Sequence, residues 1–311
     1  MKNSVLPKVQ VLLSAYNGEK YVLEQLESLR LQDYGNFTVK IRDDGSKDET
    51  FTLVSEYIKN NKLDWEVHKG ENLGFVKSFF WLLFNASEEA DFYSFCDQDD
   101  YWKKEKISRA VGKLQAERQE LPLLYSSQYT LVDKNLNPFS VKHEKADLVP
   151  SFKGALFVNI VTGCTIVLNK KMRELVISKQ MPNCVVHDWW LYLVASAFGK
   201  VVFDAYSTIF YRMHGNNVCG TSTSSYKRKF INFFKMLRGR LYLRRPGEIT
   251  EQVKDFKYIY SDKLTAKHIK DMEVFLDRRF INRLRIFLDI PFWKKSSTTN
   301  GQRVRFLFNS I

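Results

Sequence analysis

The sequence predicts an α/β fold with a mostly parallel central sheet, followed by a basic helical region. Strand-like and helix-like patterns alternate four times between Val9 and Glu117, which is typical of β-loop-α units that build a parallel sheet. Polar stretches, SAYNG, DDGS and DQDD, follow three of the expected strands. The 311 residues are 44% hydrophobic, which is enough for a substantial core.

Apolar spacing defines each unit in chain order. Val9 to Leu13 is a short apolar run, and Tyr21, Val22, Leu26 and Leu29 then recur at helical spacing. The following units repeat the theme, with DDGS as the turn of the second. We therefore expect strands at 9–13 and 37–41, within 65–74 and at 91–96, and helices at 19–31, 48–58, 75–84 and 104–117.

The three polar stretches are far apart in the sequence but share one position in the predicted fold. Each stands at the carboxyl end of a strand. Parallel sheets bind ligands beyond the carboxyl ends of their strands. We therefore expect SAYNG, DDGS and DQDD to converge on one binding site.

The stretch FCDQDDYW places three carboxylates within residues 97–100. Like charges this close destabilise the fold unless a cation or a special hydrogen-bonding loop compensates them. A solvated acidic turn is the alternative, but the preceding strand would place the cluster at the binding edge of the sheet. The sequence therefore predicts a bound cation.

The net charge of +13 is confined to the C-terminal part of the chain. Residues 226–311 hold 21 Lys and Arg against 8 Asp and Glu, whereas residues 1–225 hold 27 of each. The small, turn-prone segment GTSTSSYKRK stands at the boundary. We expect a catalytic domain at 1–220, in halves of about 1–102 and 103–220, and a basic helical region at 221–311.

Cysteine spacing and hydropathy exclude several classes of protein. Cys96, Cys164, Cys184 and Cys219 form no C-x-x-C pair, which argues against a zinc site or a disulfide framework. No stretch reaches the roughly 18 apolar residues of a membrane span, and the N-terminus lacks a secretory apolar region. We expect a cytoplasmic protein.

An ordered set of motifs carries a family resemblance over residues 8 to about 220. SAYNGEKY, RDDGSKDET, ENLG, CDQDDYW, HDWW and YRMHGNN together resemble the family 2 glycosyltransferases of the GT-A fold, in particular their bacterial rhamnosyltransferase branch. The dinucleotide fingerprint G-x-G-x-x-G is absent. The resemblance implies a GT-A catalytic domain that uses a nucleotide-sugar donor.

The resemblance also implies a metal site and a nucleotide site. Asp99 would coordinate Mg²⁺ or Mn²⁺, Asp97 would hold the ribose or the metal shell, and His214 would complete the metal site or touch the diphosphate. Oxygen ligands suit both ions. Asp100 is either part of this cluster or a cap for the following helix. The implied nucleotide-binding residues are Ser14, Ala15, Tyr16, Asn17, Asp43, Asp44, Asn72, Gly74 and Asp97.

One carboxylate in DDGS would accept the imide N–H of uracil or thymine, while its neighbours satisfy the turn. Gly74 is either a ribose contact or only a turn residue. Asp188, in HDWW, stands where the family carries its general base; a helix N-cap is the alternative. The implied acceptor-binding residues are Thr162, Gly163, Cys164, His187, Trp189 and Trp190.

The resemblance therefore implies an inverting, metal-dependent transferase that moves L-rhamnose from dTDP-rhamnose onto a glycan or lipid-linked saccharide in cell-surface polysaccharide synthesis, with the rhamnose donor resting on HDWW and YRMHGNN. A UDP-hexose transferase is the alternative, and a nucleic-acid-binding or nucleotidyl-transferring protein is the alternative from another class.

The segments KRKFINFFKMLRGRLYLRR and FINRLRIFLDIPFWKK combine cationic and apolar sides. They indicate helices that pack on the protein or on a second subunit, with a basic face on an anionic membrane. We expect peripheral association with the inner face of the cell membrane and no nucleic-acid partner; homo-oligomerisation is left open.

Overall fold

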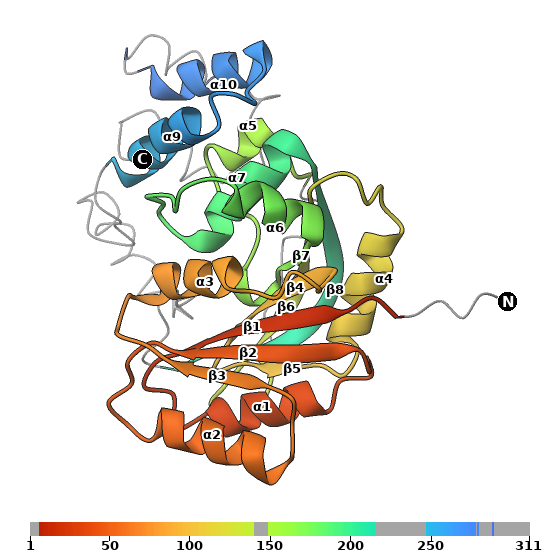
Figure 1. The fold of residues 1–311 in the computed structure, drawn as a ribbon. Helices are drawn as coiled ribbons and strands as arrows, with labels where there is room; N and C mark the ends of the chain where they lie inside the picture. Colours follow the sequence, from red (N-terminus) through yellow and green to blue (C-terminus); the bar gives the residue numbers. More distant parts are fainter. Residues whose placement is uncertain (1–5, 140–148, 215–246, 278, 280–287, 289–311) are drawn as a thin grey trace, which may run out of the picture. The chain divides into compact units, whose positions relative to one another are not determined.

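A computed structural model of the chain describes residues 6–139, 149–214, 247–277, 279 and 288. Its described part has the predicted mixed α/β architecture, with an eight-stranded sheet in the order β3-β2-β1-β4-β7-β6-β8-β5 (Figure 1). The strands are β1 (Val9–Ala15), β2 (Phe37–Asp43), β3 (Glu66–Lys69), β4 (Phe92–Asp97), β5 (Tyr101–Trp102), β6 (Leu123–Val132), β7 (Val167–Asn169) and β8 (Lys200–Arg212).

The helices of the described residues alternate with these strands through the first half of the chain. They are α1 (Val22–Arg30), α2 (Thr50–Asn60), α3 (Phe75–Phe84), α4 (Lys106–Gln115), α5 (Phe152–Ala155), α6 (Lys170–Ile177), α7 (His187–Phe198), α9 (Glu248–Ile259) and α10 (Ala266–Leu276), and a 3₁₀ turn, η1, covers Gly163–Thr165. The eight strands and helices predicted between residues 9 and 117 are all present, with ends shifted by a few residues.

The sheet is parallel at its N-terminal side. β1 lies between β2 and β4 and is parallel to both, so that Ser14 is opposite Asp97 and Ala15 is opposite Asp43. β3 adds a further parallel strand beside β2. β7 is antiparallel to β4 and β6, and β5 is antiparallel to β8. The carboxyl ends of β1, β2 and β4 therefore meet at one edge of the sheet.

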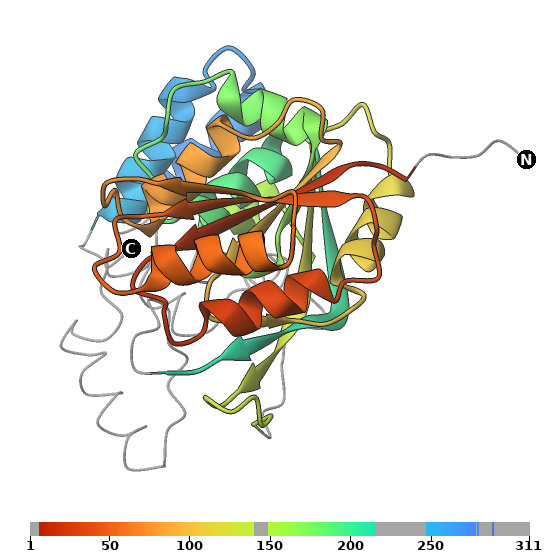
Figure 2. The same cartoon turned by 60° about the horizontal axis from the view of Figure 1, so that its bottom comes forward.

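Two layers of helices cover the sheet (Figures 1 and 2). α1, α2 and α4 lie on one face, where Val22, Leu26 and Ile107 join the main apolar core with β1 and β2. α3, α6 and α7 lie on the opposite face. Eight residues of α7, from His187 to Ala195, are buried, so α7 is a core helix.

The described residues divide into two compact units. The first comprises 6–139, 149–150, 159–181 and 186–212, and the second comprises 151–158, 182–185, 213–214 and 247–277. The predicted boundary near residue 220 lies outside the described residues. The second unit takes two short segments from within the range expected for the catalytic domain.

Aromatic stacking holds the described part of the second unit together. The Phe152 ring lies 5.8 Å from the ring of Phe256 on α9 and 4.8 Å from the ring of His268 on α10. The Gln252 side chain of α9 accepts a hydrogen bond from the Val185 backbone N–H. Apolar stripes on α9 and α10 are thus used for packing inside this unit. No helix within the described ranges is long and apolar enough to cross a bilayer.

Candidate active site

The turns after β1 and β2 are joined by hydrogen bonds. The backbone N–H of Asn17 donates to the Ser46 hydroxyl at 2.9 Å, and the Asn17 side-chain oxygen accepts from the Lys47 N–H at 2.9 Å. The Asp44 N–H donates to the Ala15 carbonyl at 2.7 Å. Asn17 adopts a positive φ of 47°, a conformation that asparagine tolerates better than most residues. SAYN and DDGS therefore form one connected surface, as predicted.

Both carboxylate oxygens of Asp44 bind groups of the protein itself. Its two carboxylate oxygens accept hydrogen bonds from the backbone N–H groups of Leu73 and Gly74, both at 2.9 Å. The Arg42 guanidinium forms an ion pair with the same carboxylate, and both side chains are buried. The buried charge is thus paired and hydrogen-bonded, which is the condition under which a buried charge is tolerated. This carboxylate fixes the ENLG loop against the DDGS turn.

Asp43 differs from its neighbour because one of its oxygens is unused. Oδ2 accepts from the Ser46 N–H at 3.2 Å. Oδ1 is buried and has no hydrogen-bond partner among the described residues. A buried acceptor without a donor is uncommon in native structures and calls for an explanation such as a bound ligand. Of the two aspartates, Asp43 is therefore the one with an acceptor to offer.

The two glycines of these loops are required by backbone geometry. Gly45 has φ +78°, and a Cβ there would lie 2.8 Å from the Asn72 backbone nitrogen. Gly74 has φ +80° and is the N-cap residue of α3. Left-handed backbone favours glycine, so Gly74 has a structural role in this turn whether or not it also contacts a ribose. Contacts of Asn72 and Gly74 with a ribose stay a prediction.

Gln98, which the sequence did not single out, connects the SAYN loop to the acidic loop. Its Oε1 accepts from the Tyr16 N–H at 2.8 Å, and its Nε2 donates to the Tyr16 carbonyl at 2.9 Å. A Cβ on Gly18 would come within 2.0 Å of Gln98 Oε1. The absence of a side chain at Gly18 therefore leaves room for this paired contact. All three predicted stretches thus converge at one edge.

The acidic loop concentrates carboxylates in a desolvated position. Burial, followed by repulsion from Asp99 and Asp188, raises the pKa of Asp97 to about 7. Burial and repulsion from Asp99 and Asp97 raise the pKa of Asp100 well above its ordinary value. The charges acting on these groups are thus mainly other carboxylates. A bound cation would reverse both effects.

Two buried cationic side chains, Arg212 and Lys106, stand close to this loop. The hydrogen bonds of these side chains described here go to groups other than the Asp97 and Asp100 carboxylates. Arg212 donates from Nε to the Asp99 carbonyl at 3.0 Å, and its guanidinium pairs with Glu24 at 2.7 Å. Its backbone N–H donates to the Asp100 carboxylate at 3.2 Å. Lys106 donates to Ser94 at 3.0 Å and lies 3.6 Å from the centre of the Trp102 ring. Burial lowers the Lys106 pKa to about 8.

Asp100 was left between two interpretations, and the structure rejects one of them. α4 begins at Lys106 with Glu105 as its N-cap residue, because the short strand β5 intervenes. Asp100 therefore does not cap this helix. Its Oδ2 is buried and has no partner counted among the described residues.

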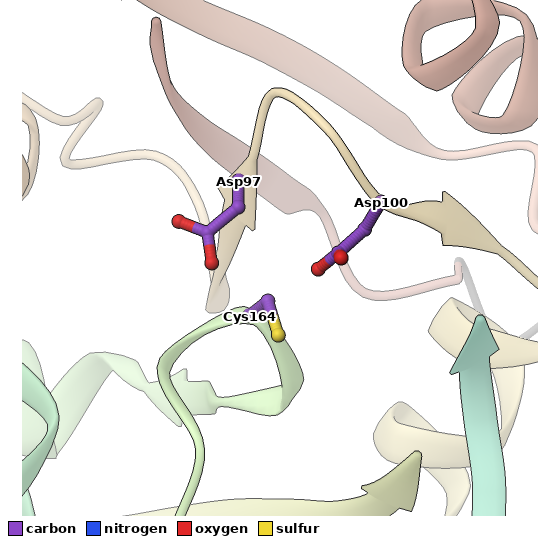
Figure 3. A group of neighbouring side chains, drawn as sticks. All are labelled: Asp97, Asp100 and Cys164. Atoms are coloured by element: carbon purple, nitrogen blue, oxygen red, sulfur yellow. The ribbon is translucent and has the colours of Figure 1, made fainter. Parts of the chain in front are cut away.

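The side chains that fit a divalent cation are Asp97, Asp100 and Cys164. One ligand atom from each lies within 4.8 Å of the others, and Figure 3 shows Cys164 beside the two aspartates, below the loop that carries them. The partnerless Asp100 Oδ2 gives this group an unused oxygen donor. The residues thus fit a metal ion. Asp99 is outside the group, so its predicted role as a ligand stays a prediction.

Asp188 lies at the first turn of α7, next to this cluster. Its carboxylate is close enough to raise the Asp97 pKa, and its Cβ lies 3.8 Å from the position that a Cβ on Gly163 would take. The N-cap of α7 is Val186, and the Asp188 carboxylate accepts from the Trp189 N–H at 2.7 Å. Asp188 is therefore not the N-cap residue of this helix.

His187 is buried in an aromatic cage. Its ring stands 4.3 Å from Phe79 and 5.5 Å from Phe95, centre to centre. Neither ring nitrogen has a hydrogen-bond partner within the described ranges, and burial lowers the pKa to about 3. A Cβ on Gly163 would lie 2.8 Å from His187 Nε2. His187 is thus neutral, and no hydrogen bond from its ring nitrogens to Asp188 is present among the described residues.

The remaining predicted acceptor residues are mostly internal. Trp189 and Trp190 are 7% and 1% exposed, so neither ring presents an open face here. The Thr162 carbonyl accepts from the N–H and hydroxyl of Thr165, which shapes the turn that carries Cys164. His214 belongs to the second unit. The binding roles of these residues stay predictions.

The fold and the converging strand ends define a glycosyltransferase of the GT-A type. A family model described as "Glycosyl transferase family 2" matches residues 10–172. The chain therefore belongs to glycosyl transferase family 2. The dTDP-rhamnosyl transferase RfbG of Shigella flexneri is 26% identical over 91% of this chain and 93% of its own length.

Solved structures show the same fold. Staphylococcus aureus TarS 1–349 in complex with UDP-GlcNAc matches with a TM-score of 0.58 at 17% identity, over 97% of this chain and 90% of that one. The mannosyltransferase PcManGT of Pyrobaculum calidifontis, in complex with GDP-Man and Mn²⁺, matches with a TM-score of 0.54 at 14% identity, over 99% and 89%.

Proposed function

We propose that this glycosyltransferase moves L-rhamnose from dTDP-rhamnose onto a glycan or lipid-linked saccharide, with inversion at the sugar, in cell-surface polysaccharide synthesis. The observation that carries the proposal is the similarity to the Shigella dTDP-rhamnosyl transferase, which extends over nearly the whole of both chains. A UDP-hexose donor is the second candidate, because TarS binds UDP-GlcNAc on the same fold.

In this proposal, Asp43 reads the base. Its unused Oδ1 accepts the imide N–H that thymine and uracil both carry, while Asp44 holds the loop. The backbone of SAYN, fixed by Ser46 and Gln98, lines the same position. In this assignment, Asp43 binds the base and Asp44 has a structural role.

Asp97, with the neighbouring oxygen and sulfur donors, would hold Mg²⁺ or Mn²⁺ beside the donor diphosphate. When bound, the ion would stabilise the charge that develops on the departing nucleoside diphosphate. Asp188 takes the proton from the acceptor hydroxyl, and its place at the N-terminus of a rigid, buried helix fixes its position. Phe79 and Phe95 pack against the neutral His187, the residue that precedes Asp188.

The base assignment is tested by Asp188→Asn. The amide keeps the size and the hydrogen bond from the Trp189 N–H but cannot accept a proton. We expect transfer to fall at least about a hundredfold, the lower range for a general base, with donor binding retained. The matched control is Asp64→Asn, at an exposed aspartate before β3, which should leave transfer unchanged. Near-normal turnover of Asp188→Asn would remove Asp188 as the base.

The donor is tested by thermal melting of the full chain with a panel of nucleotide sugars and Mn²⁺. A ligand that binds only the folded state raises the melting temperature according to its affinity. We expect dTDP-rhamnose to give the largest rise and to support transfer. A larger rise and faster turnover with UDP-GlcNAc would favour the second candidate. No response to any nucleotide sugar would contradict a transferase role.

We also propose that the basic C-terminal region associates with the anionic inner face of the cell membrane. The charge excess of residues 226–311 supports this, since each basic residue near an acidic surface adds about 1 kcal/mol of attraction. Both segments on which the proposal rests lie, almost entirely, outside the described residues. Salt-sensitive sedimentation with acidic but not neutral vesicles tests it, and equal binding to both would overturn it.

A further inference from the structure

The thiol of Cys164 is placed among carboxylates. Cys164 stands in the turn η1 and is fully buried. Its sulfur lies within 4.8 Å of oxygens from both Asp97 and Asp100 (Figure 3). The other buried cysteine of the described part, Cys96, is engaged differently: it accepts from the Gln25 amide at 3.1 Å. A thiol has one weak proton to donate, so Cys164 cannot satisfy two carboxylates.

Neither Asp97 nor Asp100 forms an ion pair within the described part of the chain, although Lys106 is near enough to Asp100 for the two charges to interact. Arg212 directs its guanidinium to Glu24, and Lys106 directs its ammonium to Ser94 and the Trp102 ring. Asp100 Oδ2 has no hydrogen-bond partner among the described residues, although Asp100 is only 1% exposed. Leaving a buried charge unpaired is strongly unfavourable. A bound cation would satisfy both carboxylates and the sulfur at once.

We propose that Cys164 ligates, as a thiolate, the divalent cation held by Asp97 and Asp100, so that the site prefers borderline ions such as Mn²⁺, Co²⁺ and Zn²⁺ to Mg²⁺. The inference rests on the proposed metal-dependent function and adds a ligand to it. Metal–oxygen distances of about 2.0–2.2 Å and metal–sulfur distances of about 2.3 Å place ligand atoms within the spread seen here. Thiolate ligands disfavour Mg²⁺, which prefers oxygen.

Coordination also accounts for the proton of the thiol. The metal ion takes the sulfur lone pair, and the thiol proton is released to solvent, as for other thiolate sites. Asp97 is partly exposed whereas Asp100 and Cys164 are buried. The open coordination positions therefore face the Asp97 side, where diphosphate oxygens would bind in the proposed reaction.

The test is a Co²⁺ titration of the reduced full chain without nucleotide, followed by absorption in the near ultraviolet. We expect a sulfur-to-cobalt charge-transfer band in the wild type. Cys164→Ser should abolish the band and weaken Co²⁺ binding by at least about tenfold, since even outer partners of metal ligands cost 10–100-fold. The matched controls Cys96→Ser and Cys184→Ser should keep the band. Co²⁺ binding by the wild type without the band overturns the inference.

Two further measurements keep the result decisive. Asp100→Asn should weaken Co²⁺ binding but retain the band, because the sulfur ligand remains. If Cys164→Ser does not fold, the proposal is judged on the spectra of the wild type and of Asp100→Asn, which should both show the sulfur-to-cobalt band. Competition with Mg²⁺ should be weak in the wild type and stronger in Cys164→Ser; equal competition in both would count against the proposal. Sugar transfer is measured separately, so a band without transfer supports the ligand and contradicts the function.

Discussion

Two acidic turns lie on either side of β1, and they differ in whether their buried carboxylates are paired with a cation of the protein. After β2, Asp44 pairs with buried Arg42 and accepts two backbone N–H groups. After β4, Asp97 and Asp100 are surrounded mainly by other carboxylates, and the nearest arginine pairs with Glu24. The turns have similar sequences, DDGS and DQDD, and both end parallel strands beside β1.

This difference separates structural from ligand-binding acid groups. A buried carboxylate that is paired with a cationic side chain and hydrogen-bonded is tolerated in the fold, but removal of either partner is strongly destabilising. A buried acid group without them costs stability until a ligand arrives. Asp44 belongs to the first kind and Asp100 to the second. Asp43, with one bonded and one unused oxygen, combines both.

Asp44→Ala should give the largest change in stability. It leaves the Arg42 guanidinium buried without its carboxylate and removes the acceptor for the Leu73 and Gly74 N–H groups. We expect the free energy of unfolding to fall by about 3–5 kcal/mol, the cost of breaking a buried ion pair. Urea denaturation of the full chain in the presence of a chelator measures it.

The matched control for this change is Asp64→Ala, at an exposed aspartate. A surface substitution of this kind should stay within about 0.5 kcal/mol. If Asp44→Ala is as mild as the control, the contrast between the two turns fails.

Asp100→Asn should change stability in the opposite direction. Without metal, it replaces an acid group whose charged form is disfavoured by burial and by Asp99 and Asp97, while the amide oxygen still accepts from the Arg212 N–H. We expect a gain of about 1 kcal/mol, opposite in sign to a typical substitution. The wild-type pKa of Asp100 is raised in the folded state, so the native protein binds this proton more tightly than the unfolded chain.

The gain from Asp100→Asn should therefore depend on pH. Wild-type stability from this group is present at low pH and is lost as pH rises above about 4, the ordinary carboxyl pKa. The advantage of the variant should appear above that pH and vanish below it. Urea midpoints measured across this range test the sign. A loss of stability at neutral pH would show that Asp100 is already compensated.

Gln98→Glu should have the smallest effect, and it probes the contact between the SAYN loop and the acidic loop. Glutamate cannot donate to the Tyr16 carbonyl. We expect nucleotide affinity to weaken about threefold, which is the lower range for one hydrogen bond. Calorimetric titration measures it. Gln119→Glu removes a comparable donor to backbone carbonyls at the end of α4 and should leave affinity unchanged; equal effects would remove Gln98 from the site.

The sequence predicted elements whose signal is local. The helix at Phe75–Phe84 has the predicted bounds because Gly74 sets its start and its apolar residues lie close together. The helix expected from Lys104 begins at Lys106 because Tyr101 and Trp102 pair with β8. That pairing joins residues more than 100 positions apart, and no local pattern reveals it.

Within the site, the sequence predicted which loops come together, but not which of their side chains hold the loops and which have atoms left for a ligand. DDGS alone does not show that Arg42 forms an ion pair with Asp44, or that Asp43 Oδ1 has no hydrogen-bond partner among the described residues. YRMHGNN drew attention to His214, but not to its Arg212, which contacts the acidic loop. The signal that could have found Arg42 and Arg212 is a cation at a strand end predicted to be buried. Gln98 and Lys106 carry no such signal.

The position of β1 between β2 and β4 has a consequence for how the chain is made. β2 follows within about twenty residues, but β4 begins only at Phe92, so one edge of the apolar strand VQVLLSA lacks its partner until then. At about 5–20 residues per second, roughly 80 residues take roughly 4–16 seconds on the ribosome. An unpaired apolar edge can pair with other chains during that time. The strand that carries the SAYN loop is therefore exposed to pairing with other chains until β4 has been made.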